Sequence, residues 1–85
     1  MAEAIVMPKL GQTVDDGTIV SWLVEEGNDV ELGEPLLIVE TDKTEVEVES
    51  VAEGVLLKIV VPAGQTVDSG TVIAYIGEPG DEIPA

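Results

Sequence analysis

Apolar residues occur along the chain in short runs that Gly, Pro, Asn and Asp interrupt. Inside most runs apolar and polar positions alternate, which is typical of strands that are buried on one side only. No stretch of useful length has the helical period of about 3.6 residues. We therefore expect strands at residues 4–7, 18–24, 36–40, 45–50, 55–61 and 72–76. Several short strands separated by turn residues predict an all-β sandwich or barrel.

The clearest alternation lies in the middle of the chain. At residues 45–49 Glu occupies every odd position and Val every even one, and Val51 follows beyond. This period of two predicts a strand with its acids in water and its valines on the apolar side. The chain as a whole favours Val and Ile over Leu and Ala, as strands do, because β-branched side chains suit a pleated surface.

The layout of the sequence repeats after 37 residues. A shift of 37 places four residues of the first copy on identical residues of the second: Gly17 on Gly54, Gly27 on Gly64, Val30 on Val67 and Gly33 on Gly70. Glycines in register indicate turns of equal geometry, because Gly accepts positive φ. Each copy consists of a strand, a turn, a short strand around the Val, a turn and a strand. Two copies of one unit predict a fold with an internal two-fold axis.

The two-fold axis has a consequence for the middle of the chain. Lys43 has 42 residues on either side. In a fold of two related halves, the connection between the halves lies at this midpoint. If the first and last strands pair near one end, the turn at residues 41–44 projects from the other end, far from both termini.

Composition excludes several classes of function. The chain has 3 Lys, no Arg and 18 Asp plus Glu, a formal net charge of −15, and it has no His and no Cys. Such a charge repels nucleic acid and anionic membranes. Without His or Cys there is no zinc site of the usual kind, no thiol nucleophile and no imidazole base, so we expect no enzyme activity of its own. No apolar run approaches the roughly 20 residues of a membrane span, and the expected location is the cytoplasm, or the mitochondrial matrix in a eukaryote.

Of the three lysines, Lys43 is the candidate for chemistry. Lys9 follows a predicted strand, and Lys58 lies inside one on its solvent side, so both are expected to be ordinary solvated charges. Lys43 lies at the tip of a predicted hairpin among acids, where a modifying enzyme can reach it. The residues alone leave open the alternative that Lys43 only decorates a polar turn.

The sequence around this lysine resembles a known family. Glu40-Thr41-Asp42-Lys43-Thr44 is similar to the lipoylation motif of lipoyl domains, the swinging-arm carriers of 2-oxo acid dehydrogenase complexes. Other stretches resemble the same family, at residues 7–11, 17–22, 26–30, 33–36, 46–50, 54–56 and 64–67. The resemblance covers residues 4–77. It implies a flattened β-barrel or sandwich of two four-stranded antiparallel sheets with internal pseudo-two-fold symmetry.

The resemblance also assigns roles at the hairpin. It implies that lipoic acid is attached covalently to Lys43, with Asp42 and Thr44 orienting that lysine for a lipoate-protein ligase or lipoyl transferase. Thr44 departs from the family, which more often has Ala there, and we expect attachment to survive. Biotin carriers have Met on both sides of their lysine, so Asp42 and Thr44 favour the lipoyl group over biotin.

A loop before the second strand is the second candidate region. Two Gly and the turn signal Asp15-Asp16-Gly17 predict a surface loop at residues 10–17. In the family this loop lies near the hairpin tip and helps partners to distinguish one lipoyl domain from another. The resemblance therefore implies partner recognition by Gly11, Gln12, Thr13, Asp15 and Asp16.

The resemblance implies a function without catalysis. A thiamine-diphosphate-dependent 2-oxo acid decarboxylase acylates the arm, an acyltransferase domain passes the acyl group to coenzyme A, and dihydrolipoyl dehydrogenase reoxidises the arm. We expect residues 1–78 to form a monomeric lipoyl domain and the Gly- and Pro-containing residues 79–85 to begin a flexible linker. The alternatives are a biotin carboxyl carrier and an acidic β-sandwich that serves as an interaction module. The sequence leaves open which 2-oxo acid is served.

Overall fold

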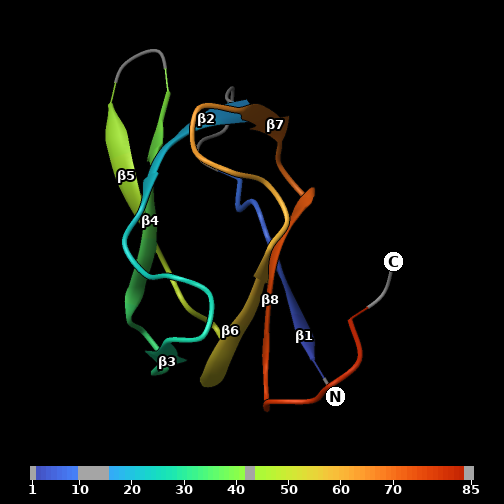
Figure 1. Cartoon of the computed structure of the whole chain (residues 1–85). Coiled ribbons are helices and arrows are strands. Elements are labelled where there is room, and N and C mark those ends of the chain that lie inside the picture. Colours follow the sequence, from blue (N-terminus) through green and yellow to red (C-terminus); the bar gives the residue numbers. More distant parts are fainter. Residues whose placement is uncertain (1, 10–15, 42–43, 84–85) are drawn as a thin grey trace.

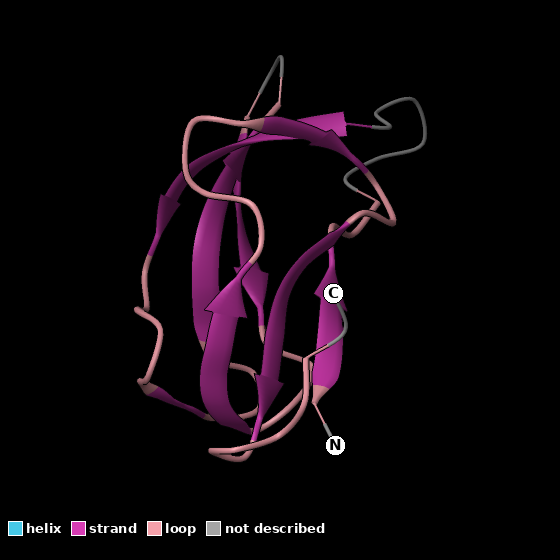
Figure 2. Ribbon diagram, turned by 45° about the vertical axis from the view of Figure 1, so that its right-hand side comes forward, coloured by secondary structure: helices cyan, strands magenta, loops and turns pink. Residues whose placement is uncertain are grey.

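The computed structural model describes residues 2–9, 16–41 and 44–83. None of these residues is helical, and the structure is built from strands and turns (Figure 2). The strands are β1 (Glu3–Val6), β2 (Asp16–Trp22), β3 (Asp29–Val30), β4 (Pro35–Glu40), β5 (Glu45–Glu49), β6 (Gly54–Ile59), β7 (Thr66–Asp68) and β8 (Val72–Gly77).

The strands form two four-stranded sheets that face each other (Figures 1 and 2). One sheet has the order β1-β8-β6-β3 and the other the order β5-β4-β2-β7, and all neighbouring strands are antiparallel. The two orders are related by a shift of four strands along the chain. β1 corresponds to β5, β8 to β4, β6 to β2 and β3 to β7. This is the architecture that the sequence predicted, a sandwich of two antiparallel sheets with an internal two-fold.

Backbone hydrogen bonds follow the same two-fold. Gly27 donates its N–H to the carbonyl of Leu56 (2.8 Å), and the residues 37 positions away repeat the bond, because Gly64 donates to Ile19 (2.6 Å). Gly27 and Gly64 have nearly the same positive φ, 94° and 95°. An L side chain is strained at such an angle, so a glycine in both copies is what this turn requires. The repeat read from the glycines is confirmed.

The residues that follow the first strand of each half are not separated by the 37 residues of the repeat. Just after β1, Met7 donates to and accepts from residues 70–71, and just after β5, Ser50 makes the equivalent pair of bonds with residues 33–34 (2.7–2.9 Å). Met7 and Ser50 are 43 positions apart rather than 37. The stretch from Met7 to Gly17 is therefore six residues longer than the equivalent stretch from Ser50 to Gly54. This insertion coincides with the predicted recognition loop.

The core lies between the sheets and draws on both halves. Its largest fully buried side chains are Met7, Ile19, Leu36, Leu37, Val39, Leu56, Ile73 and Ile76. Burying each such side chain contributes roughly 1.5–3 kcal/mol. Trp22 is partly buried against this core, and its indole Nε1–H donates to the carbonyl of Val61 (2.9 Å). That bond links the end of β2 to the chain that follows β6.

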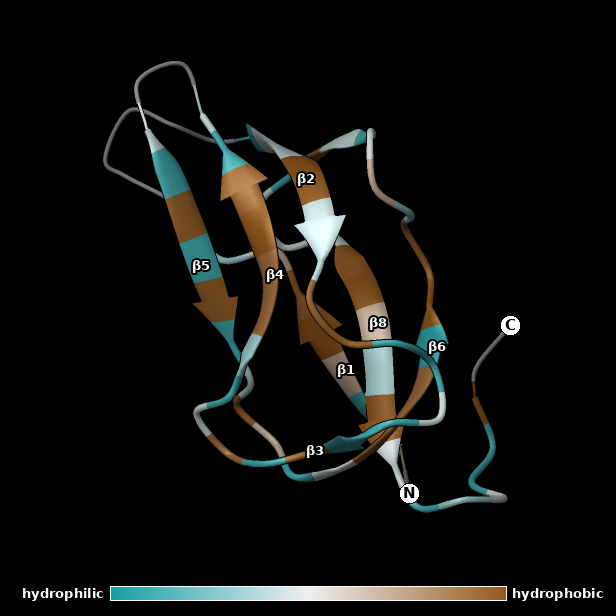
Figure 3. Cartoon of the chain, turned by 60° about the vertical axis from the view of Figure 1, so that its left-hand side comes forward, coloured by the Kyte–Doolittle hydropathy of each residue, from teal (hydrophilic) through white to brown (hydrophobic). Residues whose placement is uncertain are grey.

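The alternation in β5 is confirmed. Its three Glu side chains are exposed and Val48 is buried, and Figure 3 shows hydrophilic and hydrophobic bands alternating along the strand. The inward side then continues to Ser50, whose exposed fraction is 3% and whose hydroxyl hydrogen-bonds to the backbone of Ala52. Val51 next to it points outward and is 73% exposed.

Three strand boundaries differ from the prediction by two residues, and several others differ by one. The segments expected at 18–24 and 55–61 end at Trp22 and Ile59. Val24 and Val61 are nevertheless buried, because the chain leaves the sheet at each bend and returns an apolar side chain to the core. Residues 16–17 were expected in a loop and instead begin β2, where they pair with β7. Burial alone therefore cannot mark where a strand stops.

The two ends of the sandwich are distinct. At one end β4 and β5 finish their pairing at Glu40 and Glu45, and at the other end β1 begins with Glu3 beside Ile76 of β8 (Figure 1). The molecule measures 38 × 23 × 21 Å. The expectation that the central hairpin lies at the opposite end from the N-terminus is confirmed for the strands that support its tip. After β8 the chain turns at residues 78–81, where the Asp81 N–H donates to the Glu78 carbonyl (3.0 Å).

Candidate functional site

The candidate site lies at the outer end of the β4–β5 hairpin. Thr41 donates its N–H to the carbonyl of Thr44 (2.8 Å), and its Oγ1 hydroxyl donates to the same carbonyl (3.1 Å). The two threonines thus fix both ends of the turn that contains Asp42 and Lys43. Asp42 and Lys43 themselves lie outside the described residues. No role of its own was assigned to Thr41 from the sequence, and the spacing of three between Thr41 and Thr44 is the signal that could have identified this closure.

The hairpin is a firm support for that turn. β4 pairs with β5 from Pro35↔Glu49 to Glu40↔Glu45, and on its other side β4 pairs with β2. Val39 is fully buried and pairs with Val46, so the hairpin is anchored in the core one residue before its last pair. A group attached beyond Glu40 and Glu45 is therefore carried on a strand pair that cannot move independently of the sheet.

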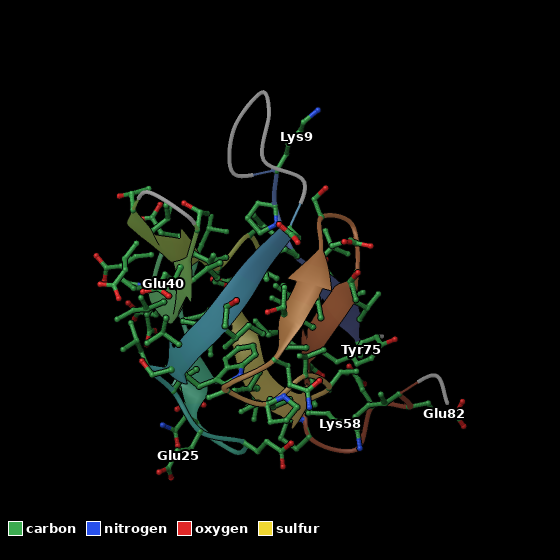
Figure 4. The ribbon with its side chains drawn as sticks, turned by 90° about the horizontal axis from the view of Figure 1, so that it is seen from above. Lys9, Glu25, Glu40, Lys58, Tyr75 and Glu82 are labelled. Carbon is green, nitrogen blue, oxygen red and sulfur yellow. The ribbon has the colours of Figure 1, made fainter. Side chains whose placement is uncertain are left out.

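The surface around the hairpin end is acidic. Glu40 and Glu45 are exposed and pair with each other across the two strands. Asp16 begins β2 two residues before Thr18, which pairs with Glu40, and Asp16 itself pairs with Asp68 of β7. Carboxylates from four strands therefore gather at this end. Figure 4 looks down on this end, with Glu40 on the hairpin at the left of the view and Lys9 at the top.

The predicted recognition residues are only partly placed. Asp16 is exposed at the start of β2, at the hairpin end of the sheet, as the prediction requires of a residue near the tip. Gly11, Gln12, Thr13 and Asp15 lie outside the described residues. Of the other lysines, Lys9 and Lys58 are both exposed, as expected for solvated charges.

The described residues offer little to other kinds of chemistry. No group of three or more His, Cys, Asp or Glu in the described ranges is arranged to hold a metal ion. Within the same ranges there is no helix of the length and apolarity needed to cross a membrane. A site for covalent attachment of a carrier group requires neither a metal site nor a membrane helix. It requires an amine on a well-supported turn. The lysine of the sequence and the threonine-closed hairpin fit the attachment of a carboxylic acid cofactor such as lipoic acid through an amide bond.

Comparisons with known proteins agree with this geometry. Residues 3–76 match the family model described as "Biotin-requiring enzyme". The chain is 49% identical over 85 residues to the dihydrolipoyllysine-residue acetyltransferase component of the pyruvate dehydrogenase complex of Corynebacterium glutamicum, covering 100% of this chain and 12% of that protein. It is 43% identical over 83 residues to the mitochondrial pyruvate dehydrogenase complex protein X component of Chaetomium thermophilum, covering 96% and 19%. The chain thus spans less than a fifth of these relatives.

Solved structures give the same result. The lipoyl domain of the 2-oxoglutarate dehydrogenase complex of Azotobacter vinelandii superposes with a TM-score of 0.71 at 35% identity, covering 91% of this chain and 98% of that one. The urea carboxylase of Kluyveromyces lactis superposes with a TM-score of 0.75 at 27% identity, covering 91% of this chain and 6% of that one. The fold and the hairpin define a carrier domain rather than a catalyst. The chain belongs to the biotin- and lipoyl-carrier family and, within it, to the lipoyl domains.

Proposed function

We propose that this domain carries an acyl group for a 2-oxo acid dehydrogenase complex on a lipoyl group that is amide-linked to Lys43. The observation that carries the proposal is the match to a lipoyl domain over 98% of that domain's length, combined with a hairpin whose ends Thr41 and Thr44 close around Asp42 and Lys43. Thr44 supports the proposal despite its departure from the usual Ala, because its carbonyl, not its side chain, closes the turn.

Attachment changes the charge of the hairpin. A lipoate-protein ligase or lipoyl transferase supplies the cofactor with an activated carboxyl group. The Lys43 ammonium first gives one proton to solvent, the neutral ε-amine attacks that carbon, the activating group leaves, and the new amide nitrogen gives up a second proton to solvent. The net charge of the domain falls from −15 to −16. Asp42 and Thr44 orient the lysine in this step.

The chain contributes position, and the cofactor contributes the reaction. When attached, the dithiolane accepts an acyl group as its disulfide is reduced, and it is oxidised again after the acyl group has left. The sandwich needs no acid or base of its own for this cycle, which fits a chain without His or Cys. Tethering raises the effective concentration of the acyl group at successive active sites. The supported hairpin limits the range over which the attachment point wanders.

The partners follow from this cycle. They are the ligase or transferase, a thiamine-diphosphate-dependent decarboxylase, an acyltransferase domain and dihydrolipoyl dehydrogenase. Relatives named for the pyruvate dehydrogenase complex favour pyruvate as the 2-oxo acid. Reductive acylation measured with the pyruvate and the 2-oxoglutarate decarboxylases separates the two substrates, and pyruvate is expected to give the faster reaction.

Recognition by partners is proposed to use the acidic hairpin end. Asp16 lies there with Glu40 and Asp68, and Gly11, Gln12, Thr13 and Asp15 precede it in the sequence. Opposite charge on a partner accelerates association, and dissolved salt screens that attraction. Association with the decarboxylase is expected to weaken as the salt concentration rises. An association constant that does not change with salt would show that charge is not the means of recognition.

Intact mass spectrometry tests the attachment. The domain is co-expressed with lipoate ligase plus lipoic acid, and separately with biotin ligase plus biotin. A lipoyl mass is expected in the first sample, complete loss of that mass in Lys43→Arg, and no loss in the matched variants Lys9→Arg and Lys58→Arg. Addition of biotin in the second sample would support a biotin carrier instead. A mass without any addition in both samples would support a plain interaction module.

A further inference from the structure

The end of the sandwich away from the hairpin carries an open groove. Its first part, about 470 Å³, is lined by Leu32, Val51 and Ala52, by the end of β8, and by four acids, which are Glu3, Glu53, Glu78 and Asp81. A second hollow of about 420 Å³ shares Glu53, Gly77 and Glu78 with the first and continues toward Asp29 and Val30. The two hollows are therefore neighbours at this end of the molecule, with Glu53, Gly77 and Glu78 in the lining of both.

The apolar wall of this groove is unusually exposed. Leu32 is 68% exposed and Val51 is 73% exposed, more than any other large apolar side chain in the described part of the chain. Gly33 donates its N–H to the carbonyl of Ser50, and Ser50 donates its N–H to the carbonyl of Glu34, so the two turns are held together. The side chains of Leu32 and Val51 line the same hollow. Each exposed leucine or valine leaves apolar area in water, and that area is available to a partner.

The internal two-fold shows that the fold does not require this wall. Leu32 corresponds to Ser69 by the 37-residue shift, and Val51 corresponds to Pro8 by the 43-residue shift that relates Ser50 to Met7. The backbone bonds at the two places are equivalent, because Gly70 donates to Met7 as Gly33 donates to Ser50. The same turn therefore has the small polar residue Ser69 at one end of the molecule and the large apolar residue Leu32 at the other.

The charge of the groove selects what can occupy it. Carboxylates from β1, from the turn before β6 and from the turn after β8 surround Leu32 and Val51, and no lysine is among the described residues that line either hollow. An apolar strip between carboxylates complements a segment that alternates aliphatic and cationic side chains. The carboxylates of the groove repel an acidic segment. A purely cationic segment has no apolar side chains with which to cover Leu32 and Val51.

We propose that this groove, defined by Leu32, Val51, Glu3 and Glu53, docks an extended protein segment in which Lys or Arg residues accompany aliphatic side chains. The groove lies at the opposite end of a 38 Å molecule from the hairpin tip. A segment bound there leaves the tip free to enter other sites. The docking is independent of the modification of Lys43, so a failure of the proposed lipoylation would not affect it.

The test uses the isotope-labelled 85-residue chain and two short synthetic peptides. In the first peptide Lys alternates with Leu, and in the second Lys alternates with Gly at the same charge. The first is expected to shift the backbone amide signals of Leu32, Val51, Glu53 and Glu78, and to bind about tenfold more tightly than the second. Shifts confined to the hairpin end, or equal binding of both peptides, would overturn the proposal.

Variants assign the binding to the groove. Leu32→Ser, which installs the residue found at the two-fold position, together with Val51→Ser is expected to weaken the first peptide about tenfold. Leu23→Ser removes an exposed leucine elsewhere and should leave the affinity unchanged. Glu3→Gln with Glu53→Gln keeps the apolar wall and should weaken binding while reducing its dependence on salt. Unchanged affinity in both double variants contradicts docking at this groove.

Discussion

The two ends of the sandwich are built on the same plan and are used differently. At one end residues 41–44 close a turn through Thr41 and Thr44, and at the other residues 78–81, which lie 37 positions later, close a turn through Glu78 and Asp81. The first turn continues directly into β5. The second follows β8 and does not lead into β1, the strand that pairs with β8.

This difference shows how an internally symmetric fold acquires a direction. At the hairpin end residues 41–44 join β4 directly to β5, and in the sequence the stretch from Met7 to Gly17 is six residues longer than the equivalent stretch from Ser50 to Gly54. The other end has instead the apolar wall of Leu32 and Val51. The shared hydrogen bonds build the scaffold, and the residues that break the symmetry separate a carrying end from a docking end.

The largest expected effect tests how equal the two halves are in the core. Leu36 and Ile73 are two-fold partners and both are fully buried. Leu36→Ala and Ile73→Ala should each lower the free energy of unfolding by about 2–5 kcal/mol, since each removes buried apolar atoms and leaves a cavity. Urea unfolding followed by Trp22 fluorescence measures both. A loss confined to one variant would show that the halves contribute unequally.

A smaller effect is expected at two glycines that share a positive φ but differ in their surroundings. Gly54 has φ of +143°, and a Cβ placed on it would lie 2.6 Å from the Gly77 carbonyl oxygen of β8. Gly64 has a positive φ too, but a Cβ there meets open space. Gly54→Ala should therefore cost about 3 kcal/mol and Gly64→Ala about 1 kcal/mol in the same unfolding experiment. Equal costs would mean that backbone strain alone, without the contact with β8, decides both.

The turn at the carrying end depends on a side-chain hydroxyl. Thr41→Val keeps the shape of the side chain and removes the bond from Oγ1 to the Thr44 carbonyl. The expected loss of stability is about 0.5–1 kcal/mol, with faster amide exchange at Thr41 and slower lipoylation. Thr66→Val, which removes the hydroxyl that contacts Thr18 on β2, is the matched control and should leave the lipoylation rate unchanged. Equal rates in Thr41→Val and the unmodified sequence would mean that the backbone alone closes the turn.

The turn at the docking end has the smallest effect, and it depends on pH. The Glu78 N–H donates to the Asp81 carboxylate (3.0 Å), and this bond holds the pKa of Asp81 below its ordinary value of 3.8. A carboxyl whose pKa is lower when folded stabilises the turn fully above that ordinary value and loses the effect as the pH falls through the folded pKa. The amide signal of Glu78 should move in this range, and Asp81→Asn should abolish the movement. A signal that moves equally in Asp81→Asn would assign the change to another group.

The sequence predicted the fold wherever a repeated pattern constrained it. Alternation identified the long strands, and the repeated glycines identified β3 and β7, which are too short to be recognised by alternation alone. The ends of β2 and β6 were wrong, because Val24 and Val61 stay buried after the chain has left the sheet. Burial then no longer reports on strand pairing.

The site was predicted by a different route. Lys43 stood out through the motif around it and through its place at the midpoint, and the described hairpin ends agree with that place. The prediction that grouped Val51 with the inward valines was wrong, because position 51 continues the odd, solvent-facing positions of Glu45, Glu47 and Glu49. The buried Ser50, with its bonds to residues 33–34, keeps the inward side, and Val51 points outward. The groove therefore became visible only in three dimensions.

The crossed arrangement of the strands has a consequence for synthesis. Each sheet mixes strands from both halves, and β1 has β8 as its only neighbour within its sheet. A nascent chain that has emerged only as far as the lysine lacks β5, β6, β7 and β8, so neither the hairpin nor either sheet can be completed. The hairpin that presents the lysine becomes a stable structure only after residue 77 has left the ribosome. A modifying enzyme that requires the structured hairpin thus acts on finished domains and passes over truncated ones.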